Sequence, residues 1–319
     1  MDEMPRTTGI PVVDFSGFLS GTADQRRAVA KQIGTACESV GFLYLSNHGV
    51  PADALERIFA AAKAFFGLPQ DRLMAIEATR LHYRGYLPLS VRTYAATGLP
   101  DVFEAFKMQL DLPLDDPDVL AGKPLHQVNK WPDGMPEWRS EVLSYWARME
   151  SLSHDLLRAF ALALDEPEET FLSFYRKPLA QLSLLHYPSK PARAPAEQWS
   201  MQPHTDTGAF TILAQDNTGG LQVQPLSGEW IDAVPLPGAY VINIGDMMQR
   251  WTNGRFASTP HRVLNRTGKE RVSIPFFMNP DFDVRIEPLP SCVTPERPLA
   301  FEPLAVGDFI WRTFTKDWK

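Results

Sequence analysis

Cysteine is scarce in this sequence. Only two of the 319 residues are cysteine, Cys37 and Cys292, and they lie far apart, with no spacing typical of a zinc site or a redox pair. Folds held together by disulfides are therefore excluded, and the simplest interpretation is a reduced, cytoplasmic chain.

Long apolar runs and dense basic clusters are missing as well. No stretch approaches the roughly 18 continuous apolar residues of a membrane span, and residues 1–10 carry acid and proline where a secretory signal needs a basic start and an apolar run. Asp and Glu outnumber Lys and Arg by 38 to 31, which gives a formal net charge of −7. Because binding of nucleic-acid phosphates depends on clustered positive charge, we expect no nucleic-acid partner. The lack of a long apolar run likewise predicts no membrane association. A small molecule is the expected partner.

The composition that remains is that of an ordinary globular chain, with 44% apolar and 22% charged residues, but the hydrophobic period changes along it. Apolar residues recur at helical spacing in 24–40, 51–66 and 136–164, and the aromatic stretch 41–50 is typical of a strand. From about residue 177 the pattern changes to short apolar runs separated by turn residues. These runs are 182–187, 207–215, 221–224, 240–244, 272–278 and 284–287.

This pattern predicts an α+β protein in two parts. Residues 1–175 would form a mostly helical supporting region with a few strands, and residues 176–319 an antiparallel β-rich core, a sandwich or barrel, with a tail. The last stretch, 305–318, is expected to be a closing helix. It could fold over the mouth of the barrel or pack passively.

Three residues with metal-ligand chemistry fall at the edges of predicted strands. His204 and Asp206 are separated by one residue, so on a strand both side chains project from the same face. His261 lies at the edge of another predicted strand. Two histidines and one carboxylate form the facial triad associated with non-haem Fe(II), which leaves positions open for substrates and O₂. The alternatives are a chance surface pair for the first two residues and a structural histidine for the third.

Ten residues after His261, Arg271 and Ser273 share one face of an apolar strand. A guanidinium beside a hydroxyl suits a carboxylate, because arginine can bind one through two parallel hydrogen bonds. A buried arginine without an anion beside it would be energetically unfavourable. If this strand is buried, we therefore expect the site to bind an anion. The alternative is an ordinary edge-strand arginine in solvent.

In this order and spacing, the motifs resemble those of the 2-oxoglutarate/Fe(II)-dependent dioxygenases of the isopenicillin N synthase-like superfamily. The resemblance extends over nearly the whole chain. The resemblance rests first on the pair His204 and Asp206, on His261, and on the pair Arg271 and Ser273. The other matching segments are Ile10–Asp14, Gly41–Tyr44, Asn47–Val50, Leu185–Pro188, Gly219–Val223, Asn243–Asp246 and Trp251–Gly254.

The resemblance implies a double-stranded β-helix (jelly-roll) core with supporting N-terminal helices and a C-terminal helical tail. It implies that His204, Asp206 and His261 ligate Fe(II), and that Arg271 and Ser273 hold the distal carboxylate of the cosubstrate 2-oxoglutarate. Tyr187 would reach the cosubstrate from a neighbouring strand. One departure is Leu185, which stands where many plant members have asparagine. The implied activity is O₂-dependent oxidation of a small metabolite by hydroxylation, desaturation or cyclisation, with release of succinate and CO₂.

Candidates for contact with the oxidised substrate are weaker. Arg84 lies in a segment where relatives of this fold often contact substrate, and it is the candidate for an acidic substrate group; a solvated loop arginine is the alternative. Phe106 and Phe276, with Phe103 and Phe314, are candidates for an apolar pocket, although aromatics in such patterns are more often core residues.

Two other functions stay open on the sequence. One is an iron oxidase that uses no 2-oxo acid, as isopenicillin N synthase does, in which Arg271 and Ser273 bind the substrate's own carboxylate. The other is a metal-binding sensor or scaffold without catalysis, against which the intact triad and anion site argue. The identity of the substrate and the oligomeric state are not encoded in any recognisable motif.

Overall fold

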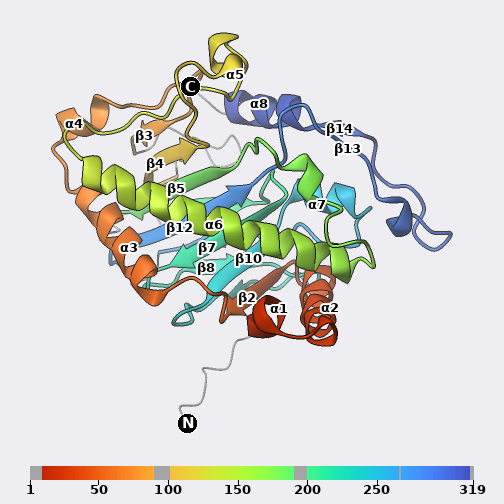
Figure 1. Cartoon of the computed structure of the whole chain (residues 1–319). Helices are drawn as coiled ribbons and strands as arrows, with labels where there is room; N and C mark the ends of the chain where they lie inside the picture. The colour runs from red at the N-terminus through yellow and green to blue at the C-terminus, as the bar shows by residue number, and fades with distance from the viewer. Residues whose placement is uncertain (1–8, 90–100, 190–199, 266, 317–319) are drawn as a thin grey trace.

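The computed structural model describes residues 9–89, 101–189, 200–265 and 267–316, and its centre is a large mixed sheet (Figure 1). The strand order in this sheet is β1-β2-β10-β7-β12-β5-β4-β3, and all neighbours are antiparallel except β1 and β2. The strands are β1 (Val12–Asp14), β2 (Phe42–Ser46), β3 (Gly85–Leu87), β4 (Glu104–Gln109), β5 (Gln181–Tyr187), β7 (Phe210–Gln215), β10 (Tyr240–Ile244) and β12 (Arg271–Met278).

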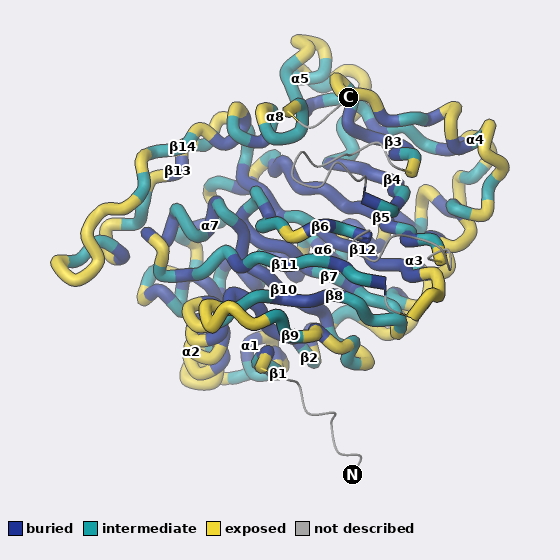
Figure 2. The backbone as a smooth tube through the Cα atoms, turned by 180° about the vertical axis from the view of Figure 1, so that it is seen from behind, coloured by how far each residue is buried: buried dark blue, intermediate teal, exposed yellow. Residues whose placement is uncertain are grey.

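A smaller antiparallel sheet lies against one face of the large sheet, as Figure 2 shows from behind. Its order is β6 (Met201–His204), β11 (His261–Val263), β8 (Leu221–Val223) and β9 (Ile231–Asp232). Apolar side chains from both sheets, among them Phe42, Leu185, Val223 and Val263, form one buried cluster between them. Two sheets packed face to face are the expected jelly-roll core. A short pair, β13 (Arg285–Ile286) and β14 (Leu304–Ala305), lies outside it.

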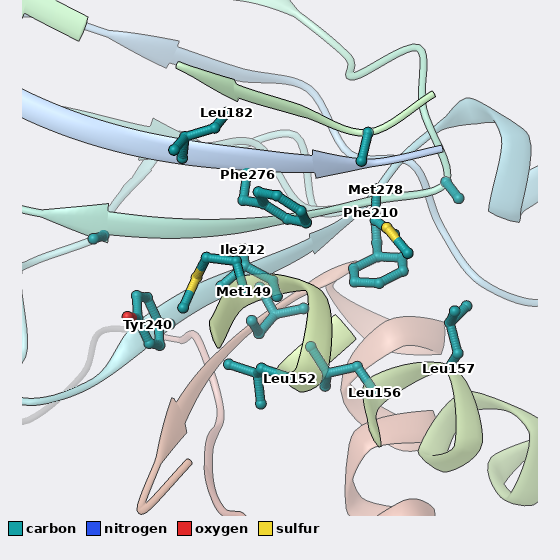
Figure 3. Packing of buried hydrophobic residues seen from close by; sticks show 14 of the residues in the cluster. Met149, Leu152, Leu156, Leu157, Leu182, Phe210, Ile212, Tyr240, Phe276 and Met278 are labelled. Atoms are coloured by element: carbon teal, nitrogen blue, oxygen red, sulfur yellow. The ribbon is translucent and has the colours of Figure 1, made fainter. Parts of the chain in front are cut away.

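Helices cover the other face of the large sheet (Figure 1). The longest is α6 (Pro136–Ala163), which begins with a proline in its first turn and carries an apolar stripe at helical spacing. Figure 3 shows Met149, Leu152 and Leu156 of this stripe facing Ile212 and Phe276 of the sheet. The other helices are α1 (Ser16–Ser20), α2 (Ala23–Ser39), α3 (Ala52–Phe66), α4 (Gln70–Met74), α5 (Pro117–Leu120), α7 (Asp246–Trp251) and α8 (Val306–Lys316), with short 3₁₀ turns at Leu172–Phe174 and Pro290–Cys292.

The predicted helices correspond to α2, α3 and α6, and the predicted strand between the first two is β2. Strands β1, β3, β4, β6, β9 and β14 have no counterpart among the expected runs. The division at residue 175 stays a prediction, but strands β1 to β4 belong to the same sheet as the later strands, and one apolar core crosses that point. Among the described residues, no helix is long and apolar enough to span a membrane.

Strand β12 shows how the two faces of the large sheet differ. Val272, Ile274, Phe276 and Met278 belong to the cluster under the helices, whereas the intervening residues Arg271, Ser273, Pro275 and Phe277 line a cavity between the two sheets. This follows from the period of two along a strand. In β12, each residue that faces the cavity between the sheets is therefore next in sequence to a residue that faces the helices.

We predict that Phe276→Ala and Phe277→Ala have different effects on folding. Phe276 is fully buried and its ring lies 5.0 Å from that of Trp146, so its truncation should lower the free energy of unfolding by about 3–5 kcal/mol. Phe277 is only half-buried and should lose clearly less. Urea denaturation of both variants measures the difference, and equal losses would contradict the assignment of faces.

Candidate active site

The structure brings His204, Asp206 and His261 together at the edge of the small sheet. His204 ends β6 and His261 begins β11, and the two residues are directly paired in the antiparallel ladder. Their ring centroids lie 4.3 Å apart. Asp206 follows in the loop before β7, with Oδ1 3.9 Å from Nε2 of His204 and 3.7 Å from Nε2 of His261. One ligand atom from each residue lies within 4.8 Å of the others, which fits a single metal ion.

Hydrogen bonds hold both imidazoles in the orientation that a metal requires. Nδ1 of His204 lies 2.7 Å from the carbonyl oxygen of Gln202, and Nδ1 of His261 lies 3.2 Å from that of Thr259. Because a carbonyl can only accept, each Nδ1 must carry the proton and donate it. This leaves Nε2, which lies on the Asp206 side of each ring, as the nitrogen that can ligate a metal.

The carboxylate of Asp206 is held in a similar way. Its Oδ2 accepts hydrogen bonds from Oγ1 of Thr211 at 2.5 Å and from Nδ2 of Asn243 at 2.8 Å, so Oδ1 is left for the metal. Burial by itself would raise the pKa of Asp206, but the imidazoles of His261 and His204 and these two hydrogen bonds hold that pKa below its ordinary value. The carboxylate is therefore ionised at neutral pH, in the form that binds a cation.

An inner cavity of about 60 Å³ extends from the triad between the sheets. Arg271 and Ser273 of β12 and Tyr187 of β5 line it, together with Leu185. Arg271 is 1% exposed and donates to Oγ of Ser273 at 3.0 Å and to Oε1 of Gln215 at 3.2 Å, and its guanidinium lies 4.9 Å from the ring centroid of Tyr187.

The hydrogen-bond partners Ser273 and Gln215 are both uncharged, and Nε of Arg271 has no hydrogen-bond partner in the part of the chain that the structure describes. A buried guanidinium in such surroundings favours binding of an anion. The inner cavity thus fits the carboxylate of a 2-oxo acid whose other end reaches the metal.

An outer cavity of about 280 Å³ opens on the other side of the triad. It shares Leu185, Met201, His204, Asp206 and Phe277 with the inner cavity, so two of the three triad residues line both cavities, whereas His261 lines the inner one alone. Its other lining residues come from three parts of the chain: Tyr83, Asp101, Phe103 and Lys107; Gln181, Ser183, Thr205, Thr207, Gly208 and Asn279; and Ile310, Thr313 and Phe314 of α8.

Three candidate substrate residues, Arg84, Phe106 and Phe276, do not line this cavity. Phe106 and Phe276 are fully buried in the core under the helices. Arg84 is also buried, and its guanidinium donates to the carbonyls of Leu110 and Leu125 and to Asn129. Each of the three is one position away from a residue that does line the cavity, namely Tyr83, Lys107 and Phe277.

Counting in steps of two from Ser273 selects Phe277 rather than Phe276, so this residue could have been found from the sequence. Phe103 and Phe314 do line the cavity, as expected. The expected closing helix is α8, and its Ile310, Thr313 and Phe314 line the outer cavity. The ring of Phe314 lies 4.6 Å from that of Tyr83.

We predict that Thr211→Val weakens metal binding by roughly 10- to 100-fold, because it removes the hydroxyl that orients the carboxylate of Asp206. Thr211→Ser keeps the hydroxyl and should retain affinity close to that of the parent. Titration with Mn(II), followed by electron paramagnetic resonance, measures both constants. Equal affinity of the Val and Ser variants would show that the hydrogen bond has no role in metal binding.

Comparison with known proteins agrees with this geometry. A family model described as non-haem dioxygenase in morphine synthesis N-terminal matches residues 10–134, and one described as 2OG-Fe(II) oxygenase superfamily matches residues 177–280. The 2-oxoglutarate-Fe(II) type oxidoreductase hxnY of Emericella nidulans is 34% identical, covering 95% of this chain and 88% of the relative. The 2-oxoglutarate-dependent dioxygenase citB of Monascus ruber is 38% identical, covering 88% of this chain and 87% of the relative.

Solved structures of similar proteins have the same fold, and one of the two described next contains alpha-KG. Neurospora crassa T7H in complex with alpha-KG and thymine matches with a TM-score of 0.86 and 29% identity, covering 97% of each chain. A 2OG-Fe(II) oxygenase family protein from Caulobacter crescentus matches with a TM-score of 0.85 and 30% identity, covering 97% of this chain and 99% of that one. The relatives' names support use of 2-oxoglutarate and not the alternative of an oxidase independent of 2-oxo acids. The chain belongs to the 2OG-Fe(II) oxygenase superfamily and is a non-haem dioxygenase that uses Fe(II), 2-oxoglutarate and O₂.

Proposed function

We propose that this protein oxidises a small molecule bound in the outer cavity, with His204, Asp206 and His261 as the iron ligands. The observation that carries the proposal is that His204 and Asp206 of the triad line both cavities, of which the inner one also contains His261 and a buried arginine. One side of the metal would thus accept the cosubstrate and the other the substrate.

In the inner cavity, Arg271 would hold the distal carboxylate of 2-oxoglutarate through its guanidinium N–H groups, and Ser273 would add its hydroxyl. Tyr187 lies under the guanidinium and limits its movement, as the 4.9 Å separation supports. When bound, iron with 2-oxoglutarate and O₂ supplies an oxidant able to break a C–H bond, while the cosubstrate is converted to succinate and CO₂.

The remaining task of the chain is to position the substrate and to exclude water. Phe103, Leu185 and Phe277 give the outer cavity apolar walls, and Ile310 and Phe314 of α8 add to this apolar lining. An apolar enclosure keeps water away from the oxidising centre, so that the oxidant reacts with the bound substrate. The outcome, whether hydroxylation, desaturation or cyclisation, depends on which substrate atom lies nearest the metal.

Structurally similar proteins support a small-molecule substrate. The titles of solved structures name thymine and 5-formyluracil for T7H and JA for JOX2, all of them small molecules. We also propose a cytoplasmic location, supported by Cys37 and Cys292, which are buried and free. Cell fractionation tests that location.

Arg271→Met provides the test of the proposed function. Removing a charged hydrogen bond loses about 1.5–3 kcal/mol, so the Kd for 2-oxoglutarate should rise roughly ten- to a hundredfold. Arg262→Met is the matched control, because Arg262 stacks on Trp230, 3.8 Å from its ring centroid, and does not line either cavity. Calorimetry with Fe(II) under anaerobic conditions gives the Kd, and O₂-dependent succinate release by the parent protein gives the activity. An unchanged Kd in Arg271→Met, or the absence of succinate, would contradict the proposal.

A further inference from the structure

Helix α7 contacts both of the segments that carry the metal ligands. It begins at Asp246, directly after β10. Its first residues form hydrogen bonds with residues 205–209, which we call the Asp206 loop, and with Ser258, which shortly precedes His261. The two segments are far apart in the chain, so contacts with one shared helix can fix the spacing between their ligands.

Backbone groups at the start of α7 hold the Asp206 loop. The N–H of Asp246 donates to the carbonyl oxygen of Asp206 at 2.8 Å, and the N–H of Met247 donates to that of Gly208 at 3.0 Å. Gly245 allows this close approach, because a Cβ atom there would lie 2.3 Å from the Gly208 carbonyl oxygen and 2.8 Å from that of Asp206. The loop is thus bound to α7 through main-chain atoms, which a substitution of the Asp246 side chain leaves in place.

The side chain of Asp246 reaches the other segment. Its Oδ1 accepts a hydrogen bond from Oγ of Ser258 at 2.7 Å, and its Oδ2 lies 3.4 Å from Oγ1 of Thr205, which makes a longer and weaker bond. The N–H of Ser258 donates to Oε1 of Gln249, also on α7, at 2.7 Å. The same helix therefore holds both the side chain and the backbone of Ser258.

Ser258 is next to the residue that orients the imidazole of His261. The carbonyl oxygen of Thr259 accepts the hydrogen bond from Nδ1 of His261 at 3.2 Å, and the hydroxyl of Thr259 donates to the carbonyl oxygen of Val40 at 2.7 Å. The direction of the His261 ring thus depends on where the backbone of residues 258–259 lies. Groups that orient a ligand in this way affect metal affinity, even though they do not contact the metal.

A second role of Asp246 has to be separated from this one. Asp246 lies in the first turn of α7, where a negative charge also interacts favourably with the helix dipole. That role needs only the charge, whereas the contact with Ser258 needs a hydrogen-bond acceptor. Asparagine provides an acceptor without the charge, so it distinguishes the two roles.

We propose that Asp246 is a positioning residue of the metal site. Its carboxylate connects the Asp206 loop to the segment that precedes His261, and so holds the ligands at the spacing that a metal ion needs before the ion binds. The carboxylate acts through Ser258. The inference rests on the proposed function, because it concerns the metal ligands assigned there.

Substitution of Asp246 tests the proposal. Asp246→Ala should raise the Kd for Mn(II) about tenfold or more, because the position of the His261 ring is no longer fixed relative to the Asp206 loop. Asp246→Asn should bind Mn(II) with affinity close to that of the parent, because its carbonyl oxygen accepts from Ser258 and its NH₂ group can donate to the hydroxyl of Thr205. Titration followed by electron paramagnetic resonance gives both constants. Parent affinity in the Ala variant, or an Asn variant as weak as the Ala variant, would overturn the proposal.

Asp24→Ala is the matched control. Asp24 also lies in the first turn of a helix, α2, and lines neither cavity. This variant loses a carboxylate at a helix start and should bind Mn(II) as the parent does. A loss equal to that of Asp246→Ala would show that the effect is not specific to the metal site, and would overturn the proposal.

A double-mutant cycle tests the connection between the two segments. Ser258→Ala should weaken Mn(II) binding by a factor similar to that of Asp246→Ala, and the double variant should bind no more weakly than either single variant, because each substitution removes the same hydrogen bond. Losses that add up in the double variant would show that the two residues act independently, against the proposal.

A purely structural role gives a different result. It predicts a lower free energy of unfolding of the metal-free Asp246→Ala variant but an unchanged Kd at a temperature where that variant is folded. Urea denaturation of the metal-free protein measures the first quantity and the titration measures the second. Loss of stability without loss of affinity would overturn the proposal. If Asp246→Ala does not fold, Ser258→Ala provides the same comparison.

The titration also separates this inference from the proposed function. His204→Ala removes an assigned ligand and should abolish Mn(II) binding. If the parent does not bind Mn(II), or if His204→Ala binds it as the parent does, the proposed function fails. If the parent binds, His204→Ala does not, and Asp246→Ala binds as the parent does, only the positioning role of Asp246 is wrong.

Discussion

The large sheet has to satisfy opposite requirements on its two faces. Toward the helices it must bury apolar side chains such as Ile274 and Phe276, and toward the small sheet it must present Arg271 and Ser273 in the same strand. The period of two makes this possible, because neighbouring residues point to opposite faces. It also makes register decisive, since a shift of one residue in β12 would place the arginine under α6 and a phenylalanine beside the metal.

Burial of charge is the second constraint on the site. Arg271, Lys107 and Asp206 are all nearly closed to water, and a charge in such surroundings needs hydrogen bonds or an opposite charge. For Asp206, Thr211 and Asn243 satisfy one oxygen and leave the other for a cation. For Arg271, uncharged partners fix the guanidinium and leave capacity for a carboxylate. In both cases the protein orients the group and leaves part of its bonding capacity to a ligand.

The sequence predicts those features that depend on residues close together in the chain. It does not predict those that depend on contacts between distant segments. The position of Arg271 and Ser273 on one face of β12 follows from local spacing and needs no knowledge of the fold. The long stripe of α6 was equally local. His204 and Asp206 also come together, but the predicted shared strand face is wrong, because β6 ends at His204 and Asp206 lies in the loop that follows. By contrast, Thr211 and Asn243 lie on separate strands, and their contact with Asp206 depends on the pairing of β7 with β10. Phe106 and Phe276 are proposed from residue type, which does not show the face of the strand, and Arg84 from its place in the chain before β3. Each lies next in sequence to a residue that lines the outer cavity.

The two cavities also differ in how the chain builds them. Apart from Phe42, the described lining of the inner cavity comes from residues 185–277, a single stretch that contains the motifs of metal and cosubstrate binding. The outer cavity combines Tyr83 and Lys107 from the N-terminal part, Gln181 and Asn279 from the core, and Phe314 from α8. Substitutions in the N-terminal part or in α8 can therefore change which substrate fits without touching the groups that hold the metal and the 2-oxo acid. This separation explains in physical terms why the cosubstrate is readable from contiguous motifs, while the substrate depends on side chains that only the folded chain brings together.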